Sequence, residues 1–141
     1  MTAKLLYRVV AVVLVLFTAG HTFGFLSFRP PSADGLAVFA AMGNVRFTLD
    51  GGSYTYAGFY TGFGLMVSAY ILFSAFLAWH LGAISSTQPQ TIVTLAWAFA
   101  ALQIVCLVLG WLYFFLVPIL FSAVVSICSV WAAWLLGKAN A

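Results

Sequence analysis

Residues 5–28 read LLYRVVAVVLVLFTAGHTFGFLSF and are followed at once by Arg29-Pro30-Pro31. A helix needs roughly 20 consecutive, mostly apolar residues to cross the hydrocarbon core of a bilayer. The two prolines end the helix, because proline lacks a backbone N–H and its ring clashes with the preceding turn. The stretch therefore predicts a first membrane-spanning helix over about residues 5–28.

The charged start of this helix allows a second interpretation. Lys4 and Arg8 lead into an apolar run, as basic residues do in a secretory signal peptide. The run continues to Phe28, however, which is longer than the roughly 7–15 residues of a signal peptide's apolar region. No clear A-x-A cleavage site follows it. We expect a retained helix.

The composition of the whole chain indicates a lipid environment. Of its 141 residues, 65% are hydrophobic and 5% are charged, and the mean hydropathy is +1.16. A soluble domain carries about 25% charged residues, and the five Lys and Arg and two Asp of this chain cannot cover a water-facing surface. The cations are scattered and form no nucleic-acid-binding motif. We therefore expect the lipid bilayer, and no nucleic acid, as a partner.

Three further stretches are long and apolar enough to cross a membrane. Gly82 closes the first of them, Pro89 precedes the second, and Pro118 takes a favourable first-turn position in the third. The sequence thus predicts an all-α membrane protein, a four-transmembrane-helix bundle in a single transmembrane domain over residues 1–141. The further spans are predicted at about residues 56–81, 91–110 and 118–136.

Only the first connection, residues 29–55, is long enough to hold structure of its own. Ser32 is a favourable N-cap and Asp34 suits the positive end of a helix, which predicts a short helix over about residues 33–42. Residues 45–50 alternate between apolar and polar, as a half-buried strand does. We expect this segment to form a compact lid over one end of the bundle.

The cations also predict the orientation. Four crossings place both termini on one side of the membrane, together with Lys4, Arg8 and Lys138. The opposite side has Arg29 and Arg46. Because cytoplasmic segments carry the excess of Lys and Arg, we expect both termini in the cytoplasm.

Two G-x-x-x-G motifs lie within the predicted helices. One joins Gly20 and Gly24, and the other joins Gly58 and Gly62. Small residues at this spacing let membrane helices approach closely. We expect these glycines to serve helix packing, with a direct functional role as the alternative.

His21 and Gln103 are polar side chains at membrane depth, where a polar group is costly without a partner. At about 1.5 Å per residue, His21 lies roughly 25 Å and Gln103 roughly 20 Å above the terminal side. Ser68 and Ser122 come out at similar heights, so these four residues are predicted to form one layer. They either stabilise the bundle by bonding one another or a carbonyl, or they hold the polar end of a ligand or move a proton.

The inventory of ligating residues predicts no metal and no cofactor. His80 lies about 20 Å below His21 by the same count, so one haem iron cannot take both histidines of a single chain as axial ligands. Cys106 and Cys128 lack C-x-x-C spacing and lie in apolar segments. Too few His, Cys and carboxylate groups remain for a metal site.

Three strings carry a resemblance to known proteins. GHTFGF at 20–25, FRPP at 28–31 and FSAFLAWH at 73–80 resemble sequences of an uncharacterised bacterial family of small four-helix integral membrane proteins. The resemblance spans most of the chain. It implies a multi-pass protein of the bacterial cytoplasmic (inner) membrane, and it supplies no catalytic residue.

The first functional hypothesis is a non-enzymatic bundle that binds a lipidic or hydrophobic small molecule, or that acts as an accessory subunit in a homo-oligomer or larger membrane complex. Arg29 and Arg46 would grip a phosphate or carboxylate headgroup above the polar layer of His21 and Gln103.

Two alternatives remain open. A membrane enzyme would use His21 as general acid or base, although no carboxylate lies at its depth and no catalytic residue is identified. A small dimeric channel or transporter would use the serine stripe of the last helix, at Ser122, Ser126 and Ser129.

Overall fold

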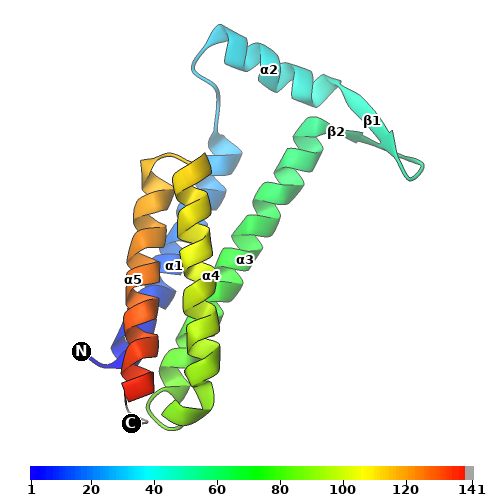
Figure 1. Ribbon diagram of the computed structural model, residues 1–141. Helices are drawn as coiled ribbons and strands as arrows, with labels where there is room; N and C mark the ends of the chain where they lie inside the picture. Colours follow the sequence, from blue (N-terminus) through cyan, green and yellow to red (C-terminus); the bar gives the residue numbers. More distant parts are fainter. Residues whose placement is uncertain (139–141) are drawn as a thin grey trace. The chain divides into compact units, whose positions relative to one another are not determined.

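The computed structural model describes residues 1–138 of the chain. Four helices are long and apolar enough to cross a membrane, the third of them preceded by a 3-10 turn, η1 (Pro89–Ile92). The chain is therefore an all-α membrane protein, as predicted. The four helices are α1 (Ala3–Ser27), α3 (Tyr56–Ile84), α4 (Val93–Tyr113) and α5 (Leu116–Lys138) (Figure 1).

The helix ends differ from the predicted ones by up to three residues. Helix α3 reaches Ile84 rather than residue 81, and α5 begins at Leu116 rather than at Pro118. Pro118 is accommodated there because the first four N–H groups of a helix have no partner within it, so a missing N–H in the first turn breaks no bond. The turn between α4 and α5 is consequently only two residues long, Phe114 and Phe115.

The chain folds into two compact units. Unit 1 comprises Met1–Phe17 and Ile71–Ala141, and unit 2 comprises Thr18–Tyr70. Helices α1 and α3 contribute one end to each unit.

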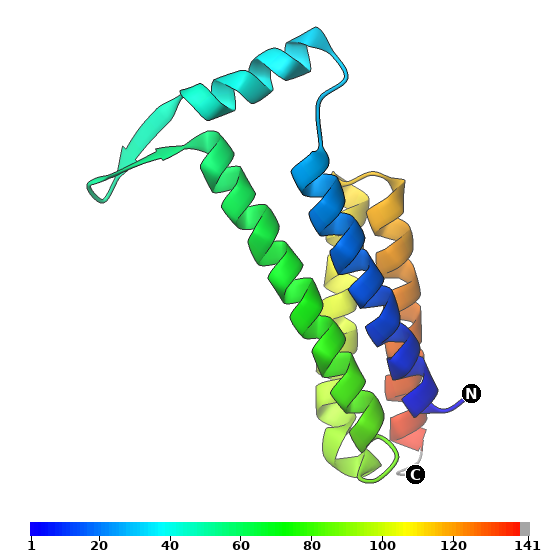
Figure 2. The same cartoon turned by 180° about the vertical axis from the view of Figure 1, so that it is seen from behind.

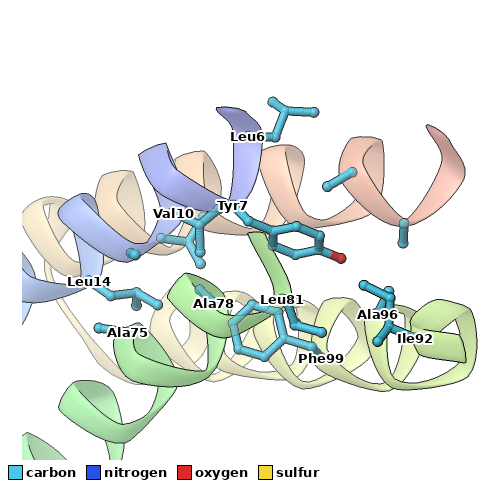
Figure 3. Close-up of a cluster of buried hydrophobic side chains, with 14 of the residues drawn as sticks. Leu6, Tyr7, Val10, Leu14, Ala75, Ala78, Leu81, Ile92, Ala96 and Phe99 are labelled. Atoms are coloured by element: carbon cyan, nitrogen blue, oxygen red, sulfur yellow. The ribbon is translucent and has the colours of Figure 1, made fainter. Parts of the chain in front are cut away.

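Unit 1 is a four-helix bundle around a hydrophobic core. Within it, the start of α1 and the end of α5 lie at the same end as the connection between α3 and η1 (Figures 1 and 2). Alanines that are completely buried, including Ala78, Ala96 and Ala132, let the helices approach closely. Figure 3 shows Tyr7, Val10 and Leu14 of α1 on the side of that helix that faces α3, whereas Leu6 points away from α3. The labelled residues of the two helices are Leu6, Tyr7, Val10 and Leu14, and Ala75, Ala78 and Leu81.

Unit 2 holds the segment between the first two spanning helices, which contains a helix and a hairpin. That this segment covers one end of the bundle as a lid stays a prediction. Helix α2 (Ala33–Asn44) begins at the predicted cap, where the Gly35 N–H donates a hydrogen bond of 3.1 Å to Ser32 Oγ. It runs two residues beyond its predicted end, and none of its residues is buried. Because most of a helix's stability in a protein comes from packing of a buried face, and α2 buries none, its caps contribute a larger share of its stability.

A hairpin follows α2. Strand β1 (Arg46–Leu49) pairs antiparallel with β2 (Gly52–Thr55). The sequence predicted the first of these strands but not the second. Asp50 and Gly51 form the two-residue turn, with φ of 51° and 78°. An Asp-Gly pair with both φ positive is the favoured connection of a two-residue hairpin, so this dipeptide was the overlooked signal.

Candidate functional site

In unit 2, a polar cluster joins α1 to α3. His21 Nε2 donates to the backbone carbonyl of Gly64 at 3.3 Å, and Ser68 Oγ donates to the same oxygen at 3.2 Å. Thr22 Oγ1 donates to Ser68 Oγ at 2.8 Å. Because a carbonyl only accepts, His21 Nε2 must carry a proton in this arrangement. The structure thus places the predicted site residues His21 and Ser68 on one shared acceptor.

The close approach at this cluster depends on Gly64. The ring of Phe25 lies directly against the Gly64 backbone, in the space that a Cβ atom would occupy. The same ring lies 5.9 Å from the His21 ring and 5.1 Å from that of Tyr60, centroid to centroid. Gly64 therefore lets an aromatic side chain cover the polar cluster.

The glycines of the two G-x-x-x-G motifs have a different environment. A Cβ atom at Gly20, Gly24 or Gly62 would meet no atom within 4 Å among the described residues, and one at Gly58 would meet the Thr55 hydroxyl at 3.1 Å. Their role in helix packing stays a prediction. The glycine that makes an interhelical contact within unit 2 is Gly64, outside both motifs.

An aromatic cluster connects the hairpin to the start of α3. The Phe47 ring lies 5.0 Å from that of Tyr56 and 5.8 Å from that of Phe59, which in turn contacts Phe63 at 4.9 Å. A shallow apolar pocket of about 250 Å³ lies beside this cluster. It is lined by Tyr54, Thr55, Gly58, Phe59, Gly62, Phe63 and Met66.

Arg29 and Arg46, which were predicted to bind a lipid headgroup, are exposed. Each donates a hydrogen bond to an oxygen of unit 2. Arg46 donates from Nε to Ser53 Oγ at 2.9 Å, on the hairpin face opposite Phe47. Arg29 donates to the carbonyl of Phe28 at 3.3 Å. Their role in ligand binding stays a prediction.

In unit 1, four polar side chains of α4 and α5 are buried. Gln103, Ser122, Ser126 and Ser129 are at most 8% exposed. Ser126 Oγ donates to the backbone carbonyl of Gln103 at 2.9 Å, across the two helices rather than one turn back along its own. His21 and Ser68 belong to unit 2, so the single layer of four residues stays a prediction.

The terminal end of unit 1 carries a contact that sequence analysis missed. The guanidinium carbon of Arg8 lies 3.2 Å from the centroid of the Trp79 ring. Gly82 permits this approach of α1 and α3, because a Cβ atom there would lie 3.2 Å from Tyr7 Cβ and 3.3 Å from the Lys4 carbonyl oxygen. No sequence motif identifies such a pair, since the contact depends on the relative rotation of two helices.

Beside this contact, an apolar groove of about 670 Å³ runs between α1 and α3 within unit 1. Its lining is almost entirely hydrocarbon, with the His80 imidazole and the Trp79 indole at one end. The His80 ring is held 4.3 Å from that of Phe76. The groove is lined by Ala11, Val12, Val15 and Leu16 of α1 and by Leu72, Ala75, Phe76, Trp79 and His80 of α3.

Within residues 1–138, no group of three or more His, Cys, Asp and Glu side chains is placed to hold a metal ion. Comparisons with protein-family models, curated proteins and solved structures gave no match for this chain.

Proposed function

We propose that this multi-pass membrane protein binds a lipidic or hydrophobic small molecule in the groove between α1 and α3 of unit 1. The observation that carries the proposal is the groove itself. Its volume of about 670 Å³ lies within the usual range of ligand sites, about 300–1,000 Å³. An elongated apolar molecule of the membrane fits this lining.

The energetics of such a site differ from those of a pocket in water. Lipid tails are as apolar as the groove walls, so burial in the groove brings no hydrophobic gain over bulk lipid. Selective retention must come from close packing on both walls and from the polar groups at the groove's end. Trp79 and His80 supply those groups.

The proposed location is the bacterial cytoplasmic membrane, with both termini in the cytoplasm. Lys4, Arg8 and Lys138 lie at the ends of α1 and α5 that share one end of unit 1 (Figure 2). This clustering of cations supports the orientation, because positive charge accumulates on the cytoplasmic side.

The test is retention of a bound molecule through purification in mild detergent, followed by native mass spectrometry and identification of the released ligand. Val15→Trp fills the groove from a side chain that is 49% exposed, so the core is left intact. We expect the wild type to retain a lipid or other hydrophobic molecule and Val15→Trp to lose it.

The matched control is Val108→Trp. Val108 is 51% exposed on α4 and lies outside the groove lining. This variant is expected to retain the molecule as the wild type does. A wild-type protein that carries no ligand, or equal retention in both variants, would contradict the proposal.

A further inference from the structure

We infer that the ligand is an anionic phospholipid, whose acyl chain lies in the groove and whose phosphate is bound by Arg8 together with His80. The inference rests on the proposed function, because the same groove is used. It adds the chemical class of the ligand and the residue that selects it.

Arg8 has an incomplete set of partners. Its guanidinium lies over the Trp79 ring, and its Nη1 atom is buried without a hydrogen-bond partner anywhere in the described part of the chain. Arg29 and Arg46, by contrast, both donate to oxygens of their own unit. A cationic donor without an acceptor is unfavourable. The Nη1 atom itself is covered by the protein, but Arg8 as a residue is only half-buried, so an anion from outside would bind through the rest of the guanidinium.

The side chains of unit 1 supply no such anion. Residues 1–17 and 71–141 contain neither Asp nor Glu, and the two aspartates, Asp34 and Asp50, both belong to unit 2. Lys4 lies one helical turn before Arg8 and adds a second positive charge to the same face of α1. This end of unit 1 thus has a positive charge that no side-chain carboxylate of the unit balances.

The phosphate of a membrane lipid matches this arrangement in chemistry and in position. A guanidinium binds phosphate oxygens through parallel N–H donors, which gives geometric selectivity as well as attraction. Trp79 holds the guanidinium by a cation–π contact at the groove's end. His80 lines the same end and offers a ring N–H.

The apolar groove matches the acyl chain of a phospholipid, and its basic end matches the phosphate. Eight of the nine lining residues are Ala, Val, Leu, Phe or Trp, and the ninth is His80. An acyl chain therefore contacts hydrocarbon along the groove, while the attached phosphate reaches the Arg8 end. An uncharged lipid would fill the groove equally well but leave Arg8 without an anion.

Lys138 provides an internal comparison. Its ammonium nitrogen lies 4.1 Å from the centroid of the Trp134 ring, near the end of α5. This is also a cation over an indole, at the same end of unit 1, yet neither residue lines the groove. A general attraction of basic residues to anionic lipid would involve both cations, whereas a built site involves Arg8 alone.

In the experiment, the purified protein is incubated with equal amounts of dioleoyl phosphatidylglycerol and dioleoyl phosphatidylcholine. Native mass spectrometry then measures how much of each lipid is bound. We expect the wild type to favour phosphatidylglycerol by about tenfold, as one charge-assisted contact allows. Arg8→Gln should lower that ratio to near one. Lys138→Gln should leave it unchanged.

A second variant keeps the inference testable if Arg8→Gln fails to fold. His80 is exposed, so His80→Leu leaves the core untouched; it removes the ring N–H donor and should lower the preference by about twofold to threefold. Circular dichroism verifies the helix content of each variant. An unchanged lipid ratio in a folded Arg8→Gln protein, or in His80→Leu, would overturn the inference.

The outcomes separate this inference from the proposed function. If Val15→Trp abolishes binding of both lipids while Arg8→Gln leaves their ratio unaltered, the groove binds lipid and the role of Arg8 is refuted. If Val15→Trp has no effect, the groove itself fails as the site. Displacement of phosphatidylglycerol by millimolar inorganic phosphate or glycerol 3-phosphate would instead indicate a site for soluble phosphate, which also overturns the inference.

Discussion

The Ser126 hydroxyl of α5 donates a hydrogen bond of 2.9 Å to the backbone carbonyl of Gln103 on α4. Both residues are buried, at 3% and 5% exposure. The bond links two helices that are joined by a two-residue turn at one end. It therefore fixes the helix pair at a second position along its length, where lipid offers no competing hydrogen-bond partner.

Ser126→Ala is expected to lower the free energy of unfolding by about 0.5–1.5 kcal/mol, the usual value of one interhelical hydrogen bond in a membrane. Reversible unfolding in dodecyl sulfate, followed by circular dichroism, measures the change. Ser129→Ala is the control, because the Ser129 hydroxyl is buried without a hydrogen-bond partner within residues 1–138. Its removal should change stability by less than about 0.5 kcal/mol, and equal losses for the two variants would refute the assignment.

Gly64→Ala should destabilise the protein by about 1–3 kcal/mol, because the added methyl overlaps the Phe25 ring and forces the covering side chain away from the polar cluster. The same unfolding measurement applies. Gly62→Ala lies two residues earlier on α3 and adds a methyl where no described atom lies within 4 Å. That control should be neutral, and a larger loss at Gly62 than at Gly64 would contradict the structure.

Gly82→Ala tests the approach of α1 and α3 at the terminal end of unit 1. One of the atoms that its Cβ would meet is the Lys4 carbonyl oxygen at 3.3 Å, a backbone atom that cannot rotate away. We expect a loss of about 1–3 kcal/mol in unfolding free energy and a change in tryptophan fluorescence, to which Trp79 contributes. Gly137→Ala, with no described atom within 4 Å of its added Cβ, should alter neither.

Gly51→Ala should weaken the hairpin of unit 2. Gly51 has φ of 78°, a conformation that costs an L-residue about 1 kcal/mol. Hydrogen exchange measures the result, with faster exchange expected for the amides of residues 46–55. At Gly43 on α2 an added Cβ meets nothing within 4 Å, so Gly43→Ala should leave those rates unchanged. Slow exchange in Gly51→Ala would show that the turn conformation is not needed.

The four spanning helices were predictable because crossing a membrane requires a certain length and an apolar composition. Residues 5–28 and the three later stretches have both. Their ends were less predictable. Ile84 and Leu116 lie where helix and interfacial turn are both compatible with the residues, so hydropathy does not decide between them. The hairpin was half predicted, since alternation identified β1 but the Asp50-Gly51 turn was not used to find β2.

The candidate groove was not predictable from the sequence. Polar residues such as His21 and Gln103 draw attention because they are costly in lipid, whereas Val12 and Val15 resemble every other lipid-facing residue. The Arg8–Trp79 contact depends on the axial register of two helices, and register in a bundle follows from the packing of many small side chains. Gly64 illustrates the same point, because it makes an interhelical contact although it belongs to neither G-x-x-x-G motif.

Helix α3 has a consequence for the membrane around it. Its 29 residues extend about 43 Å at 1.5 Å per residue, whereas the hydrocarbon layer is about 30 Å thick. The 21 residues of α4 come to about 31 Å and match that layer. An upright α3 thus projects about 13 Å into the headgroup regions, where Tyr56 and Tyr60 at one end and Trp79 at the other are well suited. In a thinner bilayer a longer part of α3 would project from the hydrocarbon layer, which favours tilting of the helix. The shorter α4 has less excess length, so we expect bilayer thickness to affect the tilt of α3 more than that of α4.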